Sequence, residues 1–385
     1  MTPRATPDRV AWIRLARTEG VGPAAFAHLL ARFGDAATAL EALPDLARES
    51  GRSLTLATRA EAEREIAAGE KCGARLLLSA DPDFPALLAA NEPPPPVLWV
   101  RGDPAWLSRP AVAVVGSREA SAAGLSLARD LAAGLGRAGW VVVSGLARGI
   151  DAAAHEGALG GGTIAVLAGG VDAIYPPQNA RLYAALVERG CILSERAIGH
   201  AAKARDFPRR NRIIAGLARG VVVVEAELRS GSLITARLAA EQGREVFAVP
   251  GHPSDPRARG VNALIREGAI LVEDAGDVIA ALDALPPLAF QRPTSPKNVL
   301  TRSRPDSVPM SDPHPGPTEA PAIASEEDTG SLMRRIDALL SPAPTSFDQI
   351  VRATGAPLPE VMAALSELNL AGRAEFRPGG AAVRL

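Results

Sequence analysis

The chain has 385 residues, a formal net charge of −1, 47% hydrophobic residues and 4% aromatic residues. Its length is too great for one ordinary domain, and its near-neutral charge rules out a uniformly basic nucleic-acid protein, although a local basic patch is compatible with it. Cys72 and Cys191 are too far apart for a metal-ligand pattern, and no apolar stretch approaches the roughly 20 residues that cross a bilayer, so we expect a cytoplasmic protein without a membrane segment or a bound metal.

The first predicted elements are short helices between residues 8 and 70. Apolar residues recur there at helical spacing, and EGVGP at 19–23 interrupts them. A Gly-x-Gly turn between two helices is typical of helix-hairpin-helix units, whose backbone N–H groups meet a DNA phosphate, but an ordinary interhelical turn has the same pattern. We predict a helical domain of sterile-alpha-motif (SAM) or helix-hairpin-helix type over 1–80, then a proline-rich connector and an edge strand over 81–109.

Short apolar runs alternate with alanine-rich stretches from Pro110 onward. The runs are AVAVVGS, GWVVVSG, TIAVLAGG, CILSE, GVVVVEA and EVFAVPG, and the helical stretches between them lie at 120–138, 179–189, 209–218 and 232–242. Continuous apolar runs of this length are typical of strands that are buried on both faces. The alternation predicts an α/β fold over 110–285, with a parallel sheet and helices on both faces.

The last part of the chain reads as a linker followed by a small domain. Residues 286–330 are rich in Pro, Ser, Thr and Asp, which predicts a disordered linker. Residues 331–385 then give three helices and two short strands around RPGG, the order of a winged helix. Its expected recognition helix, PLPEVMAALSELNL, carries acids and no arginine, which favours a protein-contact or regulatory role over phosphate binding.

Small and polar residues follow several predicted strands, at the edge where open parallel sheets bind ligands. Glycine allows the ligand to approach the backbone, and free N–H groups at a helix start attract an anion. Each loop alone reads as an ordinary turn with a serine cap, whereas four together favour an anion-binding rim. The rim residues are Gly116, Ser117, Arg118, Ser144, Gly145, Arg148, Gly169, Gly170, Ser230, Gly231 and Ser232.

Motifs of better-known anion sites are missing from the sequence. The segment GSREASAAG departs from G-x-G-x-x-G, Ser144 stands where a dinucleotide site has an acid, and no G-x-x-x-x-G-K-[ST] occurs. These absences disfavour a dinucleotide enzyme and a P-loop ATPase, so we predict no cofactor.

The densest positive charge lies in KARDFPRRNRIIAGLARG, residues 203–220, around the lone aromatic Phe207 at a helix start. This combination favours single-stranded nucleic acid, because cations follow the backbone while the ring stacks on a base. Asn211 is either a contact or a structural cap. The cationic candidates are Lys203, Arg209, Arg210 and Arg212.

Signals for catalysis are weak. Asp151 and His155 lie four residues apart, on one helical face, where such a pair can orient a general base. No nucleophile accompanies them, and Asp at a helix start commonly serves the helix dipole. We therefore expect a structural role for both residues and no enzymatic activity.

Residues 110–285 closely resemble the DNA-processing protein A family (DprA or Smf) through GSR, SGLARGIDAAAH, LAGGVDAIYPPQN, FPRRNRIIAGLARGVVVVEA, SGSLITARLAAEQGREVFAVPG and GVNALIREGA. The resemblance implies an extended Rossmann-like domain that binds single-stranded DNA, protects it, and helps load RecA recombinase in natural transformation. It also implies a homodimer, with Leu264 and Ile265 at the matching positions. The implied DNA contacts are Gly116, Ser117, Arg118, Ser144, Gly145, Phe207, Arg209, Arg210, Asn211 and Arg212, with Lys203 matched less directly because Ala204 and Arg205 intervene.

Two alternatives remain open. A nucleotide-binding hydrolase of the lysine-decarboxylase-like Rossmann group shares the glycine-rich strand ends, but it would carry a PGGxGTxxE-type motif, from which SGSLITARLAAE departs. A pure adaptor, with the winged helix as its working part, is the other.

Overall fold

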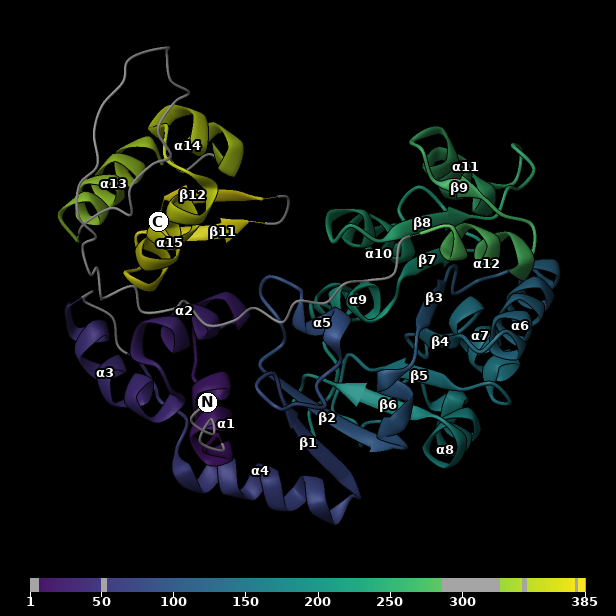
Figure 1. Cartoon of the computed structure of the whole chain (residues 1–385), viewed down its shortest axis with the longest axis horizontal. Helices are drawn as coiled ribbons and strands as arrows, with labels where there is room; N and C mark the ends of the chain where they lie inside the picture. The colour runs from purple at the N-terminus through teal and green to yellow at the C-terminus, as the bar shows by residue number, and fades with distance from the viewer. Residues whose placement is uncertain (1–6, 50–53, 286–325, 341–344, 378–379, 385) are drawn as a thin grey trace, which may run out of the picture. The chain divides into compact units, whose positions relative to one another are not determined.

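A computed structural model describes residues 7–49, 54–285, 326–340, 345–377 and 380–384 (Figure 1). The chain divides into two compact units, one of residues 1–40 and 56–292 and one of residues 41–55 and 293–385. Within the described ranges, no helix combines the length and the apolar character needed to cross a membrane.

The described part of the N-terminal region forms short helices, as predicted. They are α1 (Arg9–Arg17), α2 (Pro23–Phe33), α3 (Ala36–Glu49) and α4 (Arg59–Lys71). The Asp8 side chain caps α1, and Thr58 forms a reciprocal capping box with Glu61 at the start of α4. The turn between α1 and α2 contains Gly20 at φ +81°, a conformation that glycine adopts readily.

A nine-stranded sheet forms the centre of the larger unit, in the order β1-β2-β6-β5-β4-β3-β7-β8-β9. The strands from β3 to β9 are all parallel, which confirms the parallel sheet predicted after residue 110. Their bounds are β1 (Ala74–Leu78), β2 (Val97–Gly102), β3 (Ala111–Val115), β4 (Val141–Ser144), β5 (Thr163–Val166), β6 (Cys191–Ser194), β7 (Gly220–Val223), β8 (Glu245–Ala248) and β9 (Ile270–Leu271).

The sheet extends further back in the chain than the sequence predicts. Strands β1 and β2 join it in antiparallel pairing, and β2 lies between β1 and β6, so the expectation of an edge strand within 81–109 is wrong. The reason is visible in VLWV at 97–100, a continuous apolar run that is buried on both faces like the runs of the inner strands. The preceding prolines mark only the entry into this strand.

Helix α4 packs on this added part of the sheet. A Cβ atom at Gly69 would lie 2.1 Å from the Trp99 ring, so glycine allows the helix to approach the strand closely. Arg17 of α1 pairs with Glu65 at 2.8 Å and donates to the carbonyl oxygen of Glu195 at 3.1 Å. Helix α4 therefore packs directly on the sheet, and Arg17 ties α1 both to α4 and to the residue that follows β6.

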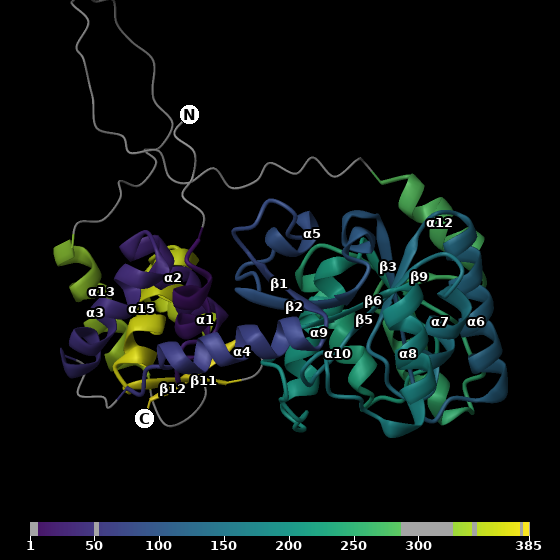
Figure 2. The ribbon, with the colours of Figure 1, turned by 90° about the horizontal axis from the view of Figure 1, so that it is seen from below.

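Helices cover both faces of the sheet, as predicted (Figures 1 and 2). Helices α6, α7 and α12 share a core with Val112, Val114 and Val222, whereas α9, α10 and α11 pack on the opposite face, onto which Ala113, Val115 and Val221 point. The helices are α5 (Ala86–Ala89), α6 (Ala122–Arg137), α7 (Ile150–Ala158), α8 (Ala180–Arg189), α9 (Asp206–Leu217), α10 (Gly231–Glu241), α11 (Arg259–Arg266) and α12 (Ala275–Asp283).

The second unit contains the predicted winged helix. Its elements are α13 (Glu326–Leu339), β10 (Thr345–Ser346), α14 (Phe347–Thr354), α15 (Leu358–Leu370), β11 (Ala374–Arg377) and β12 (Ala381–Arg384), with sheet order β10-β12-β11. Strand β10 was not predicted from the sequence. Residues 326–330 belong to α13 rather than to the predicted linker, because the composition that indicates a linker over 286–330 does not show where the next helix begins. The rest of the predicted linker lies outside the described residues.

Candidate functional site

Two adjoining cavities open at the carboxyl ends of the parallel strands. Their volumes are about 300 and 570 Å³, and both are lined by Arg118, Ala147, Arg148 and Phe207. We call the combined hollow the strand-end groove, with a smaller and a larger cavity. Its place agrees with the expectation for an open parallel sheet.

An aromatic and cationic cluster lies where the two cavities meet. The guanidinium carbon of Arg118 is 5.1 Å from the centroid of the Phe207 ring, and the Tyr175 ring centroid is 5.7 Å from that of Phe207, tilted by 60°. Tyr175 lines the smaller cavity and is 53% exposed. The sequence reasoning missed Tyr175, although an exposed aromatic after a strand end was readable in DAIYPPQN.

The loop after β3 offers unused backbone donors. Within the described residues, the N–H groups of residues 116–118 donate no hydrogen bond to the protein. The loop is held from below, because the Ile150 amide donates to the Ser117 carbonyl oxygen at 3.1 Å. Gly149 has φ +78°, and a Cβ there would lie 2.2 Å from the same oxygen. This loop is therefore a rigid set of donors suited to an anion.

The loop after β4 is held by side chains and has few free donors. Asp151 Oδ2 accepts from the amides of Gly145 at 3.2 Å and Ala147 at 3.3 Å, while Asn179 Nδ2 donates to the carbonyl oxygens of Leu146 at 2.9 Å and Ala147 at 3.2 Å. These contacts hold buried Leu146 at φ 55°, which is unfavourable for a branched residue. The Gly145 amide is thus already used within the protein.

Ser144 corrects a prediction. Its side chain is fully buried and its hydroxyl donates to the Val114 carbonyl oxygen at 2.6 Å, so it takes no part in the groove surface. Its position at the end of β4 suggested a contact with DNA. The Ser144 hydroxyl instead joins β4 to β3 through this hydrogen bond.

Arg210 is almost entirely buried in the floor of the groove, where it reaches the lining of the larger cavity. It is 7% exposed, and its Nη1 donates to the carbonyl oxygens of Gly145, at 2.7 Å, and Val166. A Cβ at Gly145 would lie 2.1 Å from this nitrogen, so glycine is required beside it. Burial lowers the pKa of Arg210 to about 10, and the charge of Asp151 opposes the shift, so the guanidinium remains cationic at neutral pH. Arg210 is primarily a positioning residue.

Asp151 and His155 do not form a general-base pair in the described structure. Burial raises the pKa of Asp151, while Arg210 and the two amide donors oppose this shift. His155 Nδ1 lies 2.7 Å from Thr163 Oγ1, whose hydroxyl donates to the Val142 carbonyl oxygen, so Nδ1 carries the proton and donates it. Burial, and then the charge of Arg210, lower the pKa of His155 to about 3.

The His155 shift predicts a pH-dependent stability. The folded pKa lies below the ordinary 6.5, so unfolding takes up a proton: the stabilisation is complete above pH 6.5 and is lost as the pH falls towards 3. One such group lowers the free energy of unfolding by about 1 kcal/mol between pH 7 and pH 5.5. In urea titrations, His155→Gln is expected to flatten this pH dependence. An unchanged slope would contradict a neutral buried imidazole.

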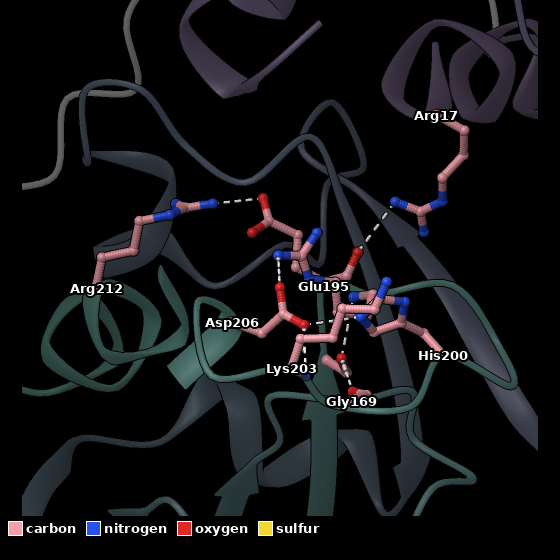
Figure 3. Close-up of polar contacts among 9 residues, drawn as sticks. Arg17, Gly169, Glu195, His200, Lys203, Asp206 and Arg212 are labelled. Atoms are coloured by element: carbon pink, nitrogen blue, oxygen red, sulfur yellow. Dashed lines mark hydrogen bonds and ion pairs between the residues drawn. The ribbon is translucent and has the colours of Figure 1, made fainter. Parts of the chain in front are cut away.

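The loop before α9 is organised around Asp206, which is 2% exposed (Figure 3). Asp206 pairs with Arg196, lies 2.9 Å from His200 Nε2, and accepts from the Lys203 amide at 2.9 Å. Burial alone would raise the pKa of Asp206, but these partners lower it. The loop is thereby fixed while the Lys203 side chain stays exposed.

The other cationic candidates on α9 diverge. Arg209 is exposed outside the cavity linings. Arg212 pairs with Glu195 (Figure 3). Asn211 Nδ2 donates to the Gly231 carbonyl oxygen at 3.2 Å, which makes it a loop-fixing amide. The helix thus brings only part of the predicted cluster to the groove.

Among the remaining rim residues, Ser230, Gly231 and Ser232 line the larger cavity. Gly169 lines the smaller cavity, and a Cβ there would lie 2.8 Å from the His200 carbonyl oxygen. Gly170 lines neither cavity, and its amide donates to that same oxygen. The groove therefore unites Gly116, Ser117, Arg118, Gly145, Arg148, Gly169, Phe207, Arg210, Asn211, Ser230, Gly231 and Ser232, and leaves out Ser144, Gly170, Lys203, Arg209 and Arg212.

The described residues contain no group of three or more His, Cys, Asp or Glu side chains placed to hold a metal ion. What the groove does offer is an exposed guanidinium, two aromatic rings and free backbone donors. That combination suits a phosphate backbone and the faces of bases.

Comparison with known proteins agrees with this chemistry. Residues 75–283 match the family model of DNA recombination-mediator protein A, residues 6–68 match a DprA-like N-terminal HHH domain, and residues 318–380 match a DprA winged helix domain. Protein Smf of Synechocystis is 33% identical over 396 aligned residues, covering 97% of this chain and 98% of the relative. DNA processing protein DprA of Streptococcus pneumoniae is 46% identical over 191 residues, covering 49% of this chain and 67% of the relative.

Two solved structures share the fold. The X-ray structure of DNA processing protein A from Streptococcus pneumoniae has a TM-score of 0.61 and 37% identity, covering 71% of this chain and 98% of that one. The Helicobacter pylori protein, described for its unique single-stranded DNA binding mode, has a TM-score of 0.50 and 30% identity, covering 54% and 95%. The family model matches more than half of the chain, the Synechocystis relative aligns over nearly its whole length, and both solved structures share the fold. The chain therefore belongs to the DNA recombination-mediator protein A family.

Proposed function

We propose that this protein binds single-stranded DNA in the strand-end groove, protects it, and helps load RecA recombinase during natural transformation, without chemically altering the strand. The observation that carries the proposal is the stack of Arg118 on Phe207 beside Tyr175, next to the free amides of residues 116–118. A guanidinium and amides suit phosphates, and exposed rings suit unpaired bases. The Helicobacter pylori relative, which binds single-stranded DNA, supports the same assignment.

The binding step is tested by fluorescence anisotropy with labelled oligo-dT at several salt concentrations. We expect the logarithm of affinity to fall linearly with the logarithm of salt, by about 0.7 for each phosphate neutralised. Duplex DNA of the same length should compete poorly, because its bases are not available for stacking. A binding signal that salt leaves unchanged would contradict the proposal.

The protection and loading steps need their own assays. Oligo-dT should resist nuclease when the protein saturates it, and RecA should form filaments faster on DNA that carries this protein. Binding without either effect would restrict the function to DNA capture. The cytoplasm is the place we propose for these steps, since internalised DNA and RecA meet there.

The hydrolase alternative is less well supported by the site. The Asp151 carboxylate is buried and accepts two amide hydrogen bonds, and His155 has a different partner. Incubation with nucleoside monophosphates tests this alternative directly. Release of free base that Asp151→Ala abolishes would replace our proposal with a hydrolase.

We further propose a homodimer that forms through α11 and β9. Leu264 and Ile265, the implied contacts, pack partly against the sheet core, whereas Leu228, Ile270 and Leu271 expose 61%, 39% and 48% of their surface. Leu228, Ile265 and Leu271 line one shallow hollow, and exposed apolar side chains that cluster in this way are typical of an interface. Leu271→Asp is expected to convert a dimer to a monomer in light scattering, and a wild-type monomer at micromolar concentration would contradict the dimer.

Asn179 provides a test of the fixed loop after β4. Asn179→Ala removes one amide that satisfies two carbonyl oxygens, so we expect a loss of about 1 kcal/mol in the free energy of unfolding. Release of Leu146 from its left-handed conformation should also weaken oligo-dT binding several-fold. Anisotropy and urea unfolding on the same preparation separate the two effects. Lower stability with unchanged affinity would mean that this loop does not shape the groove.

A further inference from the structure

The larger cavity extends beyond the Arg118 and Phe207 cluster to the start of α10. It is lined there by Arg229, Ser230, Gly231 and Ser232, none of which lines the smaller cavity. Arg229 was not among the residues predicted from the sequence. The cavity thus extends well beyond Arg118, and it has room for more of a bound strand than the one phosphate that Arg118 would contact.

The first turn of α10 offers hydrogen-bond donors that suit a bound anion. Within the described residues, the Gly231 N–H donates to no protein group, and a Cβ at Gly231 would meet nothing within 4 Å, so there is open space beside this residue. Asn211 fixes the same residue from behind through its carbonyl oxygen. The hydroxyls of Ser230 and Ser232 lie 2.7 Å apart at this turn. A free amide at a helix start, with hydroxyl groups beside it, favours an anion.

Charge in the larger cavity points the same way. Arg229 is exposed, and in the part of the chain that the structure describes it forms no ion pair. Arg210, which is 7% exposed, also lines this cavity, and its Nε has no hydrogen-bond partner. The four arginines of the lining outnumber its three acids, which are Glu119, Asp151 and Glu227.

We propose that Arg229 and the first turn of α10 form a second phosphate subsite, which holds a neighbouring phosphate of the same DNA strand that Arg118 contacts. This second subsite rests on the proposed binding of single-stranded DNA. It adds the path that the strand takes through the groove. The strand then runs from the aromatic cluster across the larger cavity towards α10. Two phosphates that are held at separate points fix the path of the strand. Because both contacts are to the backbone, this binding does not depend on the base sequence.

The test measures oligo-dT affinity against salt for Arg229→Ala and Arg229→Lys. The alanine variant is expected to bind about tenfold more weakly at low salt, and its salt dependence should become shallower by about 0.7, the share of one phosphate. The lysine variant keeps the charge and should retain the wild-type slope. Arg237→Ala is the matched control, because Arg237 is an exposed arginine of α10 that lines neither cavity.

The outcomes separate the subsite from the function beneath it. Equal affinity and slope for Arg229→Ala and Arg237→Ala, while Arg118→Ala binds weakly, would overturn the second subsite alone. Absence of wild-type binding would overturn the proposed function itself. A loss of affinity in Arg229→Ala with an unchanged salt slope would also refute the subsite, since a lost phosphate contact must release fewer counterions.

Discussion

Gly149→Ala is expected to lower the free energy of unfolding by roughly 3 kcal/mol and to abolish oligo-dT binding. The left-handed backbone at φ +78° costs about 1–2 kcal/mol for a residue with a Cβ, and forcing that atom against packed neighbours costs about 1–3 kcal/mol more. The Cβ would lie 2.2 Å from the Ser117 carbonyl oxygen, and backbone cannot rotate away as a flexible side chain can. The loop that carries Ser117 and Arg118 must therefore move.

Gly160→Ala is the control for this change. Gly149 lies directly before α7, and Gly160 lies just after the end of that helix. A Cβ at Gly160 would meet nothing within 4 Å. Urea unfolding and oligo-dT anisotropy should give wild-type values for this variant. If Gly149→Ala were as stable and bound DNA as well as the control, the two strand-end loops would not depend on each other as we infer.

Phe207→Ala is expected to weaken oligo-dT binding by about ten- to a hundredfold, since stacking of a base on an aromatic ring contributes roughly 1–3 kcal/mol. The substitution also removes the ring on which Arg118 rests. Stability should change less than affinity, because Phe207 is only partly buried and lies outside the core clusters of the sheet.

Phe207→Tyr provides the matched variant, because it keeps a stacking face. We expect it to bind oligo-dT within a few-fold of wild type. Binding of Phe207→Ala at the wild-type level would remove the ring from the site, and equal losses in both variants would point to altered packing rather than lost stacking.

The fold was largely predictable because its strands are continuous apolar runs. GVVV in β7 and AVAVV in β3 have no polar face, which indicates burial on both sides and hence a parallel sheet. Strand β9 has only two residues, and short strands of this kind leave no periodic pattern. Strand β2 was misplaced at the edge because prolines before a strand say nothing about what pairs beside it.

The site was predictable in location but not in every role. Strand ends and glycines identify the rim, since any parallel sheet brings those positions together. Whether a side chain then faces the ligand or the interior depends on packing: Ser144 and Arg210 turn inward to bind carbonyl oxygens. Asn179 and Tyr175 come from a loop that sequence spacing alone does not place beside β4 and α9.

The central claim is that an unpaired strand lies over Phe207 and Arg118 at the strand ends. Oligo-dT that contains 5-iododeoxyuridine, crosslinked by light and mapped by mass spectrometry, tests this most directly. We predict adducts on peptides that contain Phe207 or Tyr175, and their loss when unlabelled oligo-dT competes. Adducts confined to the winged helix, residues 326–384, would contradict the claim and favour an adaptor that contacts DNA elsewhere.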